Sequence, residues 1–160
     1  MSEALQDLLP GNHCFGCGPR NDNGLRLKSY WDGDRTVATF QPSAEHAAGP
    51  PHILNGGVIA TIIDCHGICT AIADAYKTEG RTPQEGAPIW YATGRMEVDY
   101  LRPCPLQDPV ELEARVIERA EKKSVVEVTL RSGSKECARG RVIAVRVPPA
   151  WRDSRGPADA

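Results

Sequence analysis

The segment that most constrains the fold is residues 55–73, an almost wholly apolar stretch of helical length. Apolar side chains occur on nearly every face of this predicted helix, so it has to be buried on most sides rather than along one stripe. Asn55 is a strong N-cap residue, and Gly56 and Gly57 follow in the first turn, where helices leave backbone N–H groups unpaired. Because the helix dipole is positive there, this end is predicted to attract negative charge, including a developing oxyanion.

A single carboxylate, Asp64, lies inside this apolar helix, about 12 Å after its start at 1.5 Å per residue. Burial strips hydration from an ionised carboxylate, so specific partners or a polar cavity must replace it. Three of its four helical neighbours are small and none is basic: Ala60, Thr61, Gly67 and Ile68. This pattern leaves room for a substrate or water and predicts a functional acid, with a buried structural acid as the alternative. His66 lies on another face and is predicted to be a core or interface histidine.

Length, charge and the N-terminal sequence define the class of protein. The 160 residues suit one domain with a real core. The balance of 19 basic and 21 acidic residues gives no overall field for nucleic acid or an anionic membrane. The N-terminal residues lack a basic, long apolar signal region, and no apolar span of about 18 residues is uninterrupted. We therefore expect a soluble, cytoplasmic protein with no nucleic-acid and no membrane partner.

Strand patterns flank the helix on both sides. Period-two alternation predicts two strands before it, joined by a hairpin turn, and four strands after it. The predicted ranges are 25–31, 36–40, 89–101, 110–119, 124–131 and 136–147. We expect an N-terminal segment (1–13, with a short helix within 2–9), a single domain (14–147) and a disordered tail (148–160). One long buried helix with these strands predicts an α+β hotdog fold, in which an antiparallel sheet wraps around one central helix.

Six cysteines occur in a chain without a secretion signal, so reduced thiols are expected. Cys14 and Cys17 form a Cys-x-x-Cys pair, which is half of a zinc site. The other cysteines are Cys65, Cys69, Cys104 and Cys137. Their convergence on the first pair is not expected, and we predict neither a metal nor another cofactor. A thioredoxin-like role is disfavoured, because no βαβ pattern surrounds the pair.

Three motifs are specific enough to compare with known families. One is Cys-Phe-Gly-Cys-Gly at 14–18, with an Asn and a Gly-Leu pair a few residues later. Another is Asn-Gly-Gly at 55–57, with Asp64 seven residues after the second glycine. The third is the strand Thr-Gly-Arg-Met-Glu-Val-Asp-Tyr-Leu-Arg-Pro at 93–103. Together they resemble the PaaI-like hotdog thioesterases, which hydrolyse acyl-CoA, over most of residues 14–147.

The resemblance implies a role for each matching position. Asp64 stands where the family has its catalytic carboxylate, which acts as a general base on water or as a nucleophile. Gly56 would donate its backbone N–H to the thioester carbonyl, and Gly57 would keep the approach open. Thr93 matches a Ser or Thr that orients the water.

One position departs from the family pattern, because Asn55 stands where the family has His. Asn can still cap the helix and donate a hydrogen bond, and we do not expect His52 or His66 to compensate. The candidates for substrate binding are His52, Asn55, Gly57 and Arg102. Apolar residues near the helix are candidates for the acyl slot: Ile53, Leu54, Val58 and Trp90. Four basic residues are candidates to bind the CoA phosphates: Arg102, Arg119, Lys122 and Lys123. The alternative is that they are solvated surface charges.

A single twisted sheet leaves open edges, so a homodimer or homotetramer is expected. The resemblance places the site at the subunit interface, with Asp64 and Thr93 as candidates to come from different chains. Two other functions stay open. A non-catalytic acyl-CoA binding or sensing module is compatible with Asn55, and a hotdog hydratase is disfavoured because its usual His, five residues after the Asp, is Cys69 here.

Overall fold

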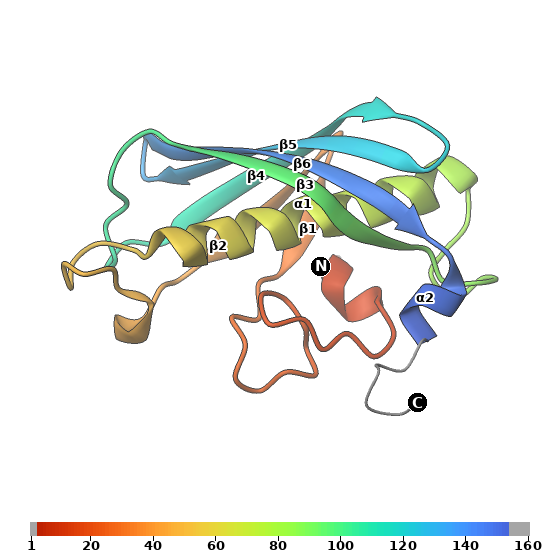
Figure 1. Ribbon diagram of the computed structural model, residues 1–160, viewed down its shortest axis with the longest axis horizontal. Coiled ribbons are helices and arrows are strands. Elements are labelled where there is room, and N and C mark those ends of the chain that lie inside the picture. The colour runs from red at the N-terminus through yellow and green to blue at the C-terminus, as the bar shows by residue number, and fades with distance from the viewer. Residues whose placement is uncertain (1–2, 154–160) are drawn as a thin grey trace.

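The computed structural model describes residues 3–153, in which a six-stranded antiparallel sheet curves over one long helix, α1 (Gly56–Glu79) (Figure 1). The strands are β1 (Ser29–Asp32), β2 (Arg35–Phe40), β3 (Trp90–Tyr100), β4 (Val110–Arg119), β5 (Lys123–Ser132) and β6 (Lys135–Val147). The short helices are η1 (Leu5–Leu8), η2 (Ala44–His46) and α2 (Pro149–Asp153). The strand order is β1-β2-β4-β5-β6-β3, so β1 and β3 form the two edges. The predicted hotdog arrangement is confirmed.

Both ends of α1 are capped, and the cap at its start is the expected one. Asn55 Oδ1 accepts hydrogen bonds from the N–H groups of Gly57 (2.7 Å) and Val58 (3.2 Å). Gly80 follows the last turn at φ 65°, the left-handed conformation that glycine adopts readily at helix ends. α1 is the one helix within residues 3–153 that is long and apolar enough to cross a membrane, and 56% of its most apolar window is buried in the fold.

Two glycines let α1 approach the sheet closely. A Cβ on Gly140 of β6 would lie 2.3 Å from Cγ2 of Ile63 on α1. A Cβ on Gly67 of α1 would lie 2.8 Å from Cγ2 of Val142 on β6. Ile63 and Val142 have no exposed surface. The core therefore lies between one face of the helix and the sheet face above it, with no room for a larger residue at either glycine.

A β-bulge in β3 decides which of its side chains face α1. The register with β6 shifts between Thr93 and Arg95, which leaves Gly94 as the extra residue. A bulge moves the in-and-out alternation by one position. As a result Thr93 before the bulge and Met96 and Tyr100 after it all contact α1 or the core around it.

The N-terminal segment packs on the side of α1 that faces away from the sheet (Figure 1). Leu5 and Leu9 are buried in the same core as the helix. The short helix predicted within 2–9 is the 3-10 helix η1, and Ser2 lies outside the described residues. A hydrogen-bonded loop then leads to β1, which begins at Ser29.

The start of the predicted disordered tail forms helix α2, so the prediction is wrong there. The guanidinium of Arg152 lies 5.4 Å from the ring centroid of Trp90. The same group donates a 2.8 Å hydrogen bond to the carbonyl of Pro10. These contacts hold α2 against both β3 and the N-terminal segment. The rest of the predicted tail, 154–160, lies outside the described residues.

Candidate active site

Asp64 on α1 and Thr93 on the edge strand β3 meet directly. Thr93 Oγ1 donates a 2.6 Å hydrogen bond to Asp64 Oδ1. Within residues 3–153, the other carboxylate oxygen, Oδ2, has no hydrogen-bond partner. Every buried side-chain oxygen in this range does have a partner, so Oδ2 is not buried and is open to solvent. One oxygen is thus fixed and the other is free to accept a proton or to attack a carbon.

A pocket of about 260 Å³ opens beside this pair. Large apolar side chains from four parts of the chain line it: Leu9 of the N-terminal segment, Ile68 and Ile72 of α1, Trp90 of β3 and Trp151 of α2. Four cysteines line it as well: Cys14, Cys17, Cys65 and Cys69. Of the residues predicted to form an acyl slot, Trp90 lines this pocket. The other three predicted slot residues do not line it, because they lie at the start of α1: Ile53, Leu54 and Val58. Trp151 was missed because its segment was predicted to be disordered.

The half-buried position of Asp64 changes its acidity. Burial raises the pKa of Asp64 above the usual carboxyl range, and the hydrogen bond from Thr93 opposes this rise. Negative charge on the nearby Cys17 sulfur also raises the pKa of Asp64. A carboxylate with a raised pKa is a better proton acceptor than an ordinary one. The environment therefore fits a carboxylate that accepts a proton.

The start of α1 offers one free backbone donor. Within residues 3–153 the N–H of Gly56 has no hydrogen-bond partner. The N–H of Gly57 was expected to be free as well, but the side chain of Asn55 occupies it. Tyr100 Oη donates a 2.7 Å hydrogen bond to the Gly56 carbonyl, a contact that the sequence did not reveal although Tyr100 lies in the third motif. Gly56 is therefore the single candidate oxyanion donor among these residues.

His52 and Arg102 lie on segments that pair beside the start of α1. The carbonyl of His52 accepts a 2.9 Å hydrogen bond from the N–H of Leu106. The N–H of Leu54 donates a 2.9 Å hydrogen bond to the carbonyl of Cys104, two residues after Arg102. Both side chains are exposed. The predicted residues therefore form two groups in one chain, one at the helix start and one around Asp64 in its middle.

The side chains of His66 and Arg119, which were also considered for the site from the sequence, make structural contacts instead. His66 is fully buried, and its Nδ1 and Nε2 lie 2.8 Å and 3.3 Å from the hydroxyls of Ser29 and Thr36. Burial lowers the pKa of His66 to about 4, so the ring is neutral and serves the core, as predicted. Arg119 forms two 2.7 Å contacts with the carboxylate of Asp74, which occupy its guanidinium.

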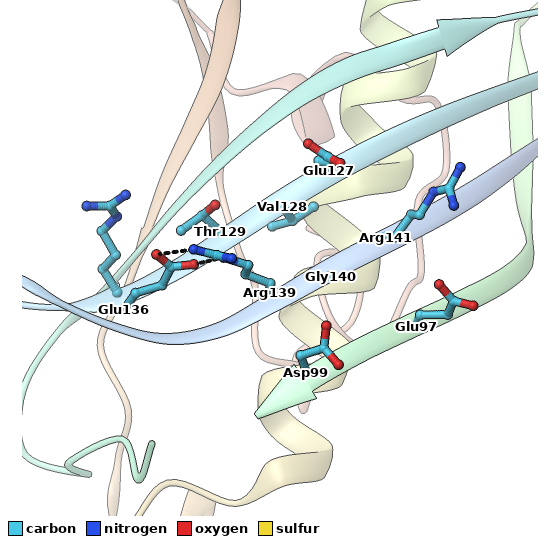
Figure 2. A pocket seen from close by; sticks show the side chains of 10 residues that line it. Glu97, Asp99, Glu127, Val128, Thr129, Glu136, Arg139, Gly140 and Arg141 are labelled. Carbon is cyan, nitrogen blue, oxygen red and sulfur yellow. Dashed lines mark hydrogen bonds and ion pairs between the residues drawn. The ribbon is translucent and has the colours of Figure 1, made fainter. Parts of the chain in front are cut away.

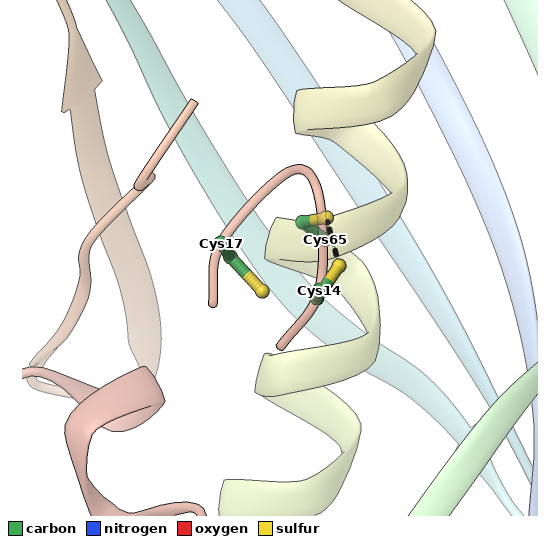
Figure 3. Close-up of side chains that lie close together, drawn as sticks. All are labelled: Cys14, Cys17 and Cys65. Atoms are coloured by element: carbon green, nitrogen blue, oxygen red, sulfur yellow. Dashed lines mark hydrogen bonds between the residues drawn. The ribbon is translucent and has the colours of Figure 1, made fainter. Parts of the chain in front are cut away.

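The prediction that the cysteines stay apart is wrong. Cys14 and Cys17 lie on a loop that folds back over α1, where Cys65 projects toward them (Figure 3). Cys69, one turn further along α1, lies beside Cys17. The Sγ atoms of Cys14 and Cys65 are 3.5 Å apart, and those of Cys17 and Cys69 are 4.0 Å apart. This long-range approach depends on the loop conformation, which spacing along the sequence does not reveal.

A larger groove of about 460 Å³ lies on the outer face of the sheet (Figure 2). Its charged lining is mixed: Glu97, Asp99, Glu127, Glu136, Arg131, Arg139 and Arg141. Arg139 is held by both carboxylate oxygens of Glu136. Opposite charges on neighbouring strands stabilise a sheet face, and the apolar surface that an acyl group needs is on the other side. This groove is therefore not the candidate active site.

Comparisons with known proteins agree with the fold. The thioesterase superfamily profile matches residues 52–138. A thioesterase superfamily protein from Shewanella loihica is 39% identical over 76% of this chain and 91% of its own, with a TM-score of 0.58. The Escherichia coli PaaI protein from the phenylacetic acid degradation operon is 17% identical over 78% of this chain and 81% of its own, with a TM-score of 0.62. No curated protein matches the sequence.

The chain belongs to the thioesterase superfamily, because the profile spans more than half of it and the Shewanella protein shares its fold at substantial identity. The likeness to PaaI concerns the fold alone at this level of identity. The matched range contains the start of α1, Asp64 and Thr93, so both groups of predicted residues lie in the part that the family shares. The resemblance to PaaI-like hotdog thioesterases is confirmed at the level of family and fold.

Proposed function

We propose that this protein is an acyl-CoA thioesterase that hydrolyses a thioester to a free acid and CoA. The observation that carries the proposal is Asp64, a half-buried carboxylate held by Thr93 at the wall of an apolar pocket. A structural acid in this position would be expected to bond a cation or several donors. Among the described residues, Asp64 has one partner and an open second oxygen.

Two routes fit this geometry. In the first, Asp64 Oδ2 takes a proton from water as the water oxygen bonds to the acyl carbon. In the second, Oδ2 itself bonds to the acyl carbon, and water then cleaves the resulting anhydride. In both routes the carbon–sulfur bond breaks and the CoA thiolate leaves and is protonated. Thr93 holds Oδ1, which orients the carboxylate in either case.

The oxyanion donor has to come from a second chain. Gly56 and Asp64 are eight residues apart on α1, which is about 12 Å along the axis. A single thioester carbonyl cannot reach both groups across that distance. Two antiparallel copies of α1 would place Gly56 of one chain beside Asp64 of the other. Thr93 and Asp64 form their hydrogen bond within one chain, so we no longer expect this pair to come from different chains. The two residues that we expect to come from different chains are Gly56 and Asp64.

The open edge of the sheet supports a homodimer. Strand β3 has β6 on one side and, within residues 3–153, no strand on the other. Its 11 residues present a row of backbone donors and acceptors that natural proteins usually pair or protect. Pairing there would bring a second copy next to Thr93. Arg102, near the start of α1, would then lie beside the partner's pocket and is our candidate to bind CoA phosphates.

A hydrolysis screen over short, long and aromatic acyl-CoA substrates tests the proposal. Release of free CoA thiol is followed against a blank without substrate, because the protein has six cysteines of its own, of which Cys14 is exposed. The proposal predicts catalytic turnover of at least one class. Stoichiometric binding without turnover would support the acyl-CoA binding alternative instead. Turnover of an enoyl-CoA by hydration, with the thioester left intact, would support the hydratase alternative.

A further inference from the structure

Four cysteines from two distant parts of the chain meet at the wall of the candidate active-site pocket. The Sγ atoms of Cys14, Cys17 and Cys65 all lie within 4.8 Å of one another (Figure 3). Cys14 and Cys65 are 3.5 Å apart, and Cys69 lies 4.0 Å from Cys17. All four are free thiols. The proposed hydrolysis uses none of them.

We propose that Cys14, Cys17, Cys65 and Cys69 bind a zinc ion. In a tetrahedral site with zinc–sulfur bonds of about 2.3 Å, neighbouring sulfurs lie about 3.8 Å apart. The Cys14–Cys65 and Cys17–Cys69 sulfur pairs, at 3.5 and 4.0 Å, bracket that spacing. Cys69 Sγ lies 4.0 Å from Cys17 Sγ but outside the group of three, so the fourth bond requires Cys69 to move toward the other two sulfurs.

The sequence positions of the four thiols suit such a site. Cys14 and Cys17 form a Cys-x-x-Cys pair, which is the usual knuckle of structural zinc sites. Cys65 and Cys69 are four residues apart on α1, so both point to the same side of the helix. Each thiol gives up its proton to solvent as it binds the ion, and no electron is transferred. Cys14 is exposed and offers the ion a route of entry.

The loop that carries Cys14 and Cys17 is built to lie against α1. A Cβ on Gly16 would stand 2.3 Å from Cys65 Sγ, so any side chain there would separate the loop from the helix. A Cβ on Gly18 would stand 2.4 Å from the backbone nitrogen of Cys14, which shows how tightly the loop turns. The N–H of Gly18 donates a 2.8 Å hydrogen bond to the Cys14 carbonyl. The N–H of Leu27 donates a 3.0 Å bond to the Gly16 carbonyl and fixes the loop from the other side.

The side chain of Asn12 adds polar support that packing alone would not require. Its Nδ2 lies 3.8 Å from Cys17 Sγ as a donor, and its Oδ1 accepts a 3.1 Å hydrogen bond from the N–H of Cys14. Buried cysteines often serve as small apolar residues, which need no donor. A donor to sulfur instead suits a thiolate that carries negative charge. With four sulfur ligands the ion would be structural, fastening the loop to α1 beside Asp64.

Metal content and cobalt spectra of the full chain, purified under reducing conditions, test the site. We expect about one zinc ion per chain. After zinc removal, cobalt should bind with a near-ultraviolet sulfur-to-cobalt charge-transfer band and the intense visible bands of a tetrahedral complex. Added zinc should abolish both signals. Zinc should also raise the melting temperature of the metal-free protein, because it binds the folded state.

Single variants assign the ligands. Cys14→Ser and Cys65→Ser should each lose most of the bound zinc and weaken the charge-transfer band, while Cys69→Ser, with three thiolates and a water, should bind cobalt more weakly and shift the visible bands. The matched controls are Cys104→Ser and Cys137→Ser, which remove a buried thiol elsewhere in the fold and should keep full metal content. Far-ultraviolet circular dichroism checks that each variant is folded.

Two results would overturn the proposal. One is a folded, fully reduced parent chain that retains only trace zinc and gives no charge-transfer band with cobalt. This readout needs no variant, so it holds even if a serine substitution prevents folding. The other is unchanged zinc content in folded Cys14→Ser and Cys65→Ser. Neither result depends on thioesterase activity, so the zinc site and the proposed function can fail separately.

Discussion

At the scale of single residues, Asp64 is the position on which the proposed chemistry depends. Asp64→Asn keeps the size and most hydrogen bonds, but it can neither accept a proton nor attack a carbonyl. We expect hydrolysis to fall by about 10²- to 10⁴-fold if Asp64 is a general base. Because the change also removes a charge held partly out of water, thermal stability should stay level or rise.

Steady-state hydrolysis beside a melting curve checks this expectation for the parent and the variant. Parent-like hydrolysis by Asp64→Asn would make Asp64 structural. Loss of activity only through unfolding would likewise favour the buried structural acid.

Thr93 provides a second test at this scale, because it holds one oxygen of the carboxylate. A hydrogen bond to a charged group contributes about 1.5–3 kcal/mol, and each 1.36 kcal/mol is a factor of ten in rate. Thr93→Ala should therefore lower kcat by about 10- to 100-fold with the fold intact. Thr93→Ser keeps the hydroxyl and should retain most of the activity. Equal rates for the Ala and Ser variants would remove Thr93 from the site.

At the scale of elements, the close approach of α1 to β6 depends on glycine. Gly140→Ala would place a methyl group 2.3 Å from Cγ2 of Ile63, so helix and strand would have to move apart. We expect a loss of about 1–3 kcal/mol in the free energy of unfolding, as for other overpacked cores. Gly49→Ala is the control, because a Cβ there meets nothing within 4 Å. Urea denaturation of both variants measures the difference, and equal midpoints would contradict the packing argument.

The predicted elements were most accurate where local pattern decides the structure. Strand β4 has the predicted bounds, Val110–Arg119, because its alternation matches a sheet with one buried face. The first strand was predicted from residue 25, but β1 begins at Ser29. Leu27 instead bonds to the loop carbonyl of Gly16, and Arg26 has φ 54°, which breaks an extended strand. A polar–apolar alternation cannot distinguish such a loop from a strand.

The candidate site was predictable to a similar degree. Asp64, Gly56 and Thr93 were found from helix spacing and the family resemblance, and the structure adds that Thr93 bonds Asp64 in the same chain. The capping of Gly57 by Asn55 follows from cap geometry and was only partly foreseen. The cysteine cluster was missed, because residues about 50 positions apart approach through a loop whose path depends on tertiary contacts.

At the scale of the whole molecule, the account requires at least two chains for one site. Within residues 3–153, one chain holds the Gly56 N–H apart from the Asp64 carboxylate and leaves the edge of β3 without a partner strand. We therefore expect a homodimer or homotetramer in solution at micromolar concentration. Sedimentation and activity measured on the same sample test this. A fully active monomer would contradict it.

The most direct test of the shared site mixes two inactive chains. Gly56→Pro removes the N–H donor at the first helical position, where proline is well tolerated, and Asp64→Asn removes the carboxylate. Each homodimer should be inactive. A mixed dimer regains one intact site, built from Gly56 of the Asp64→Asn chain and Asp64 of the Gly56→Pro chain. With random pairing the co-expressed mixture should recover about a quarter of the parent hydrolysis rate. A mixture that stays as inactive as the separate variants would contradict a site shared between Gly56 and Asp64 of two chains.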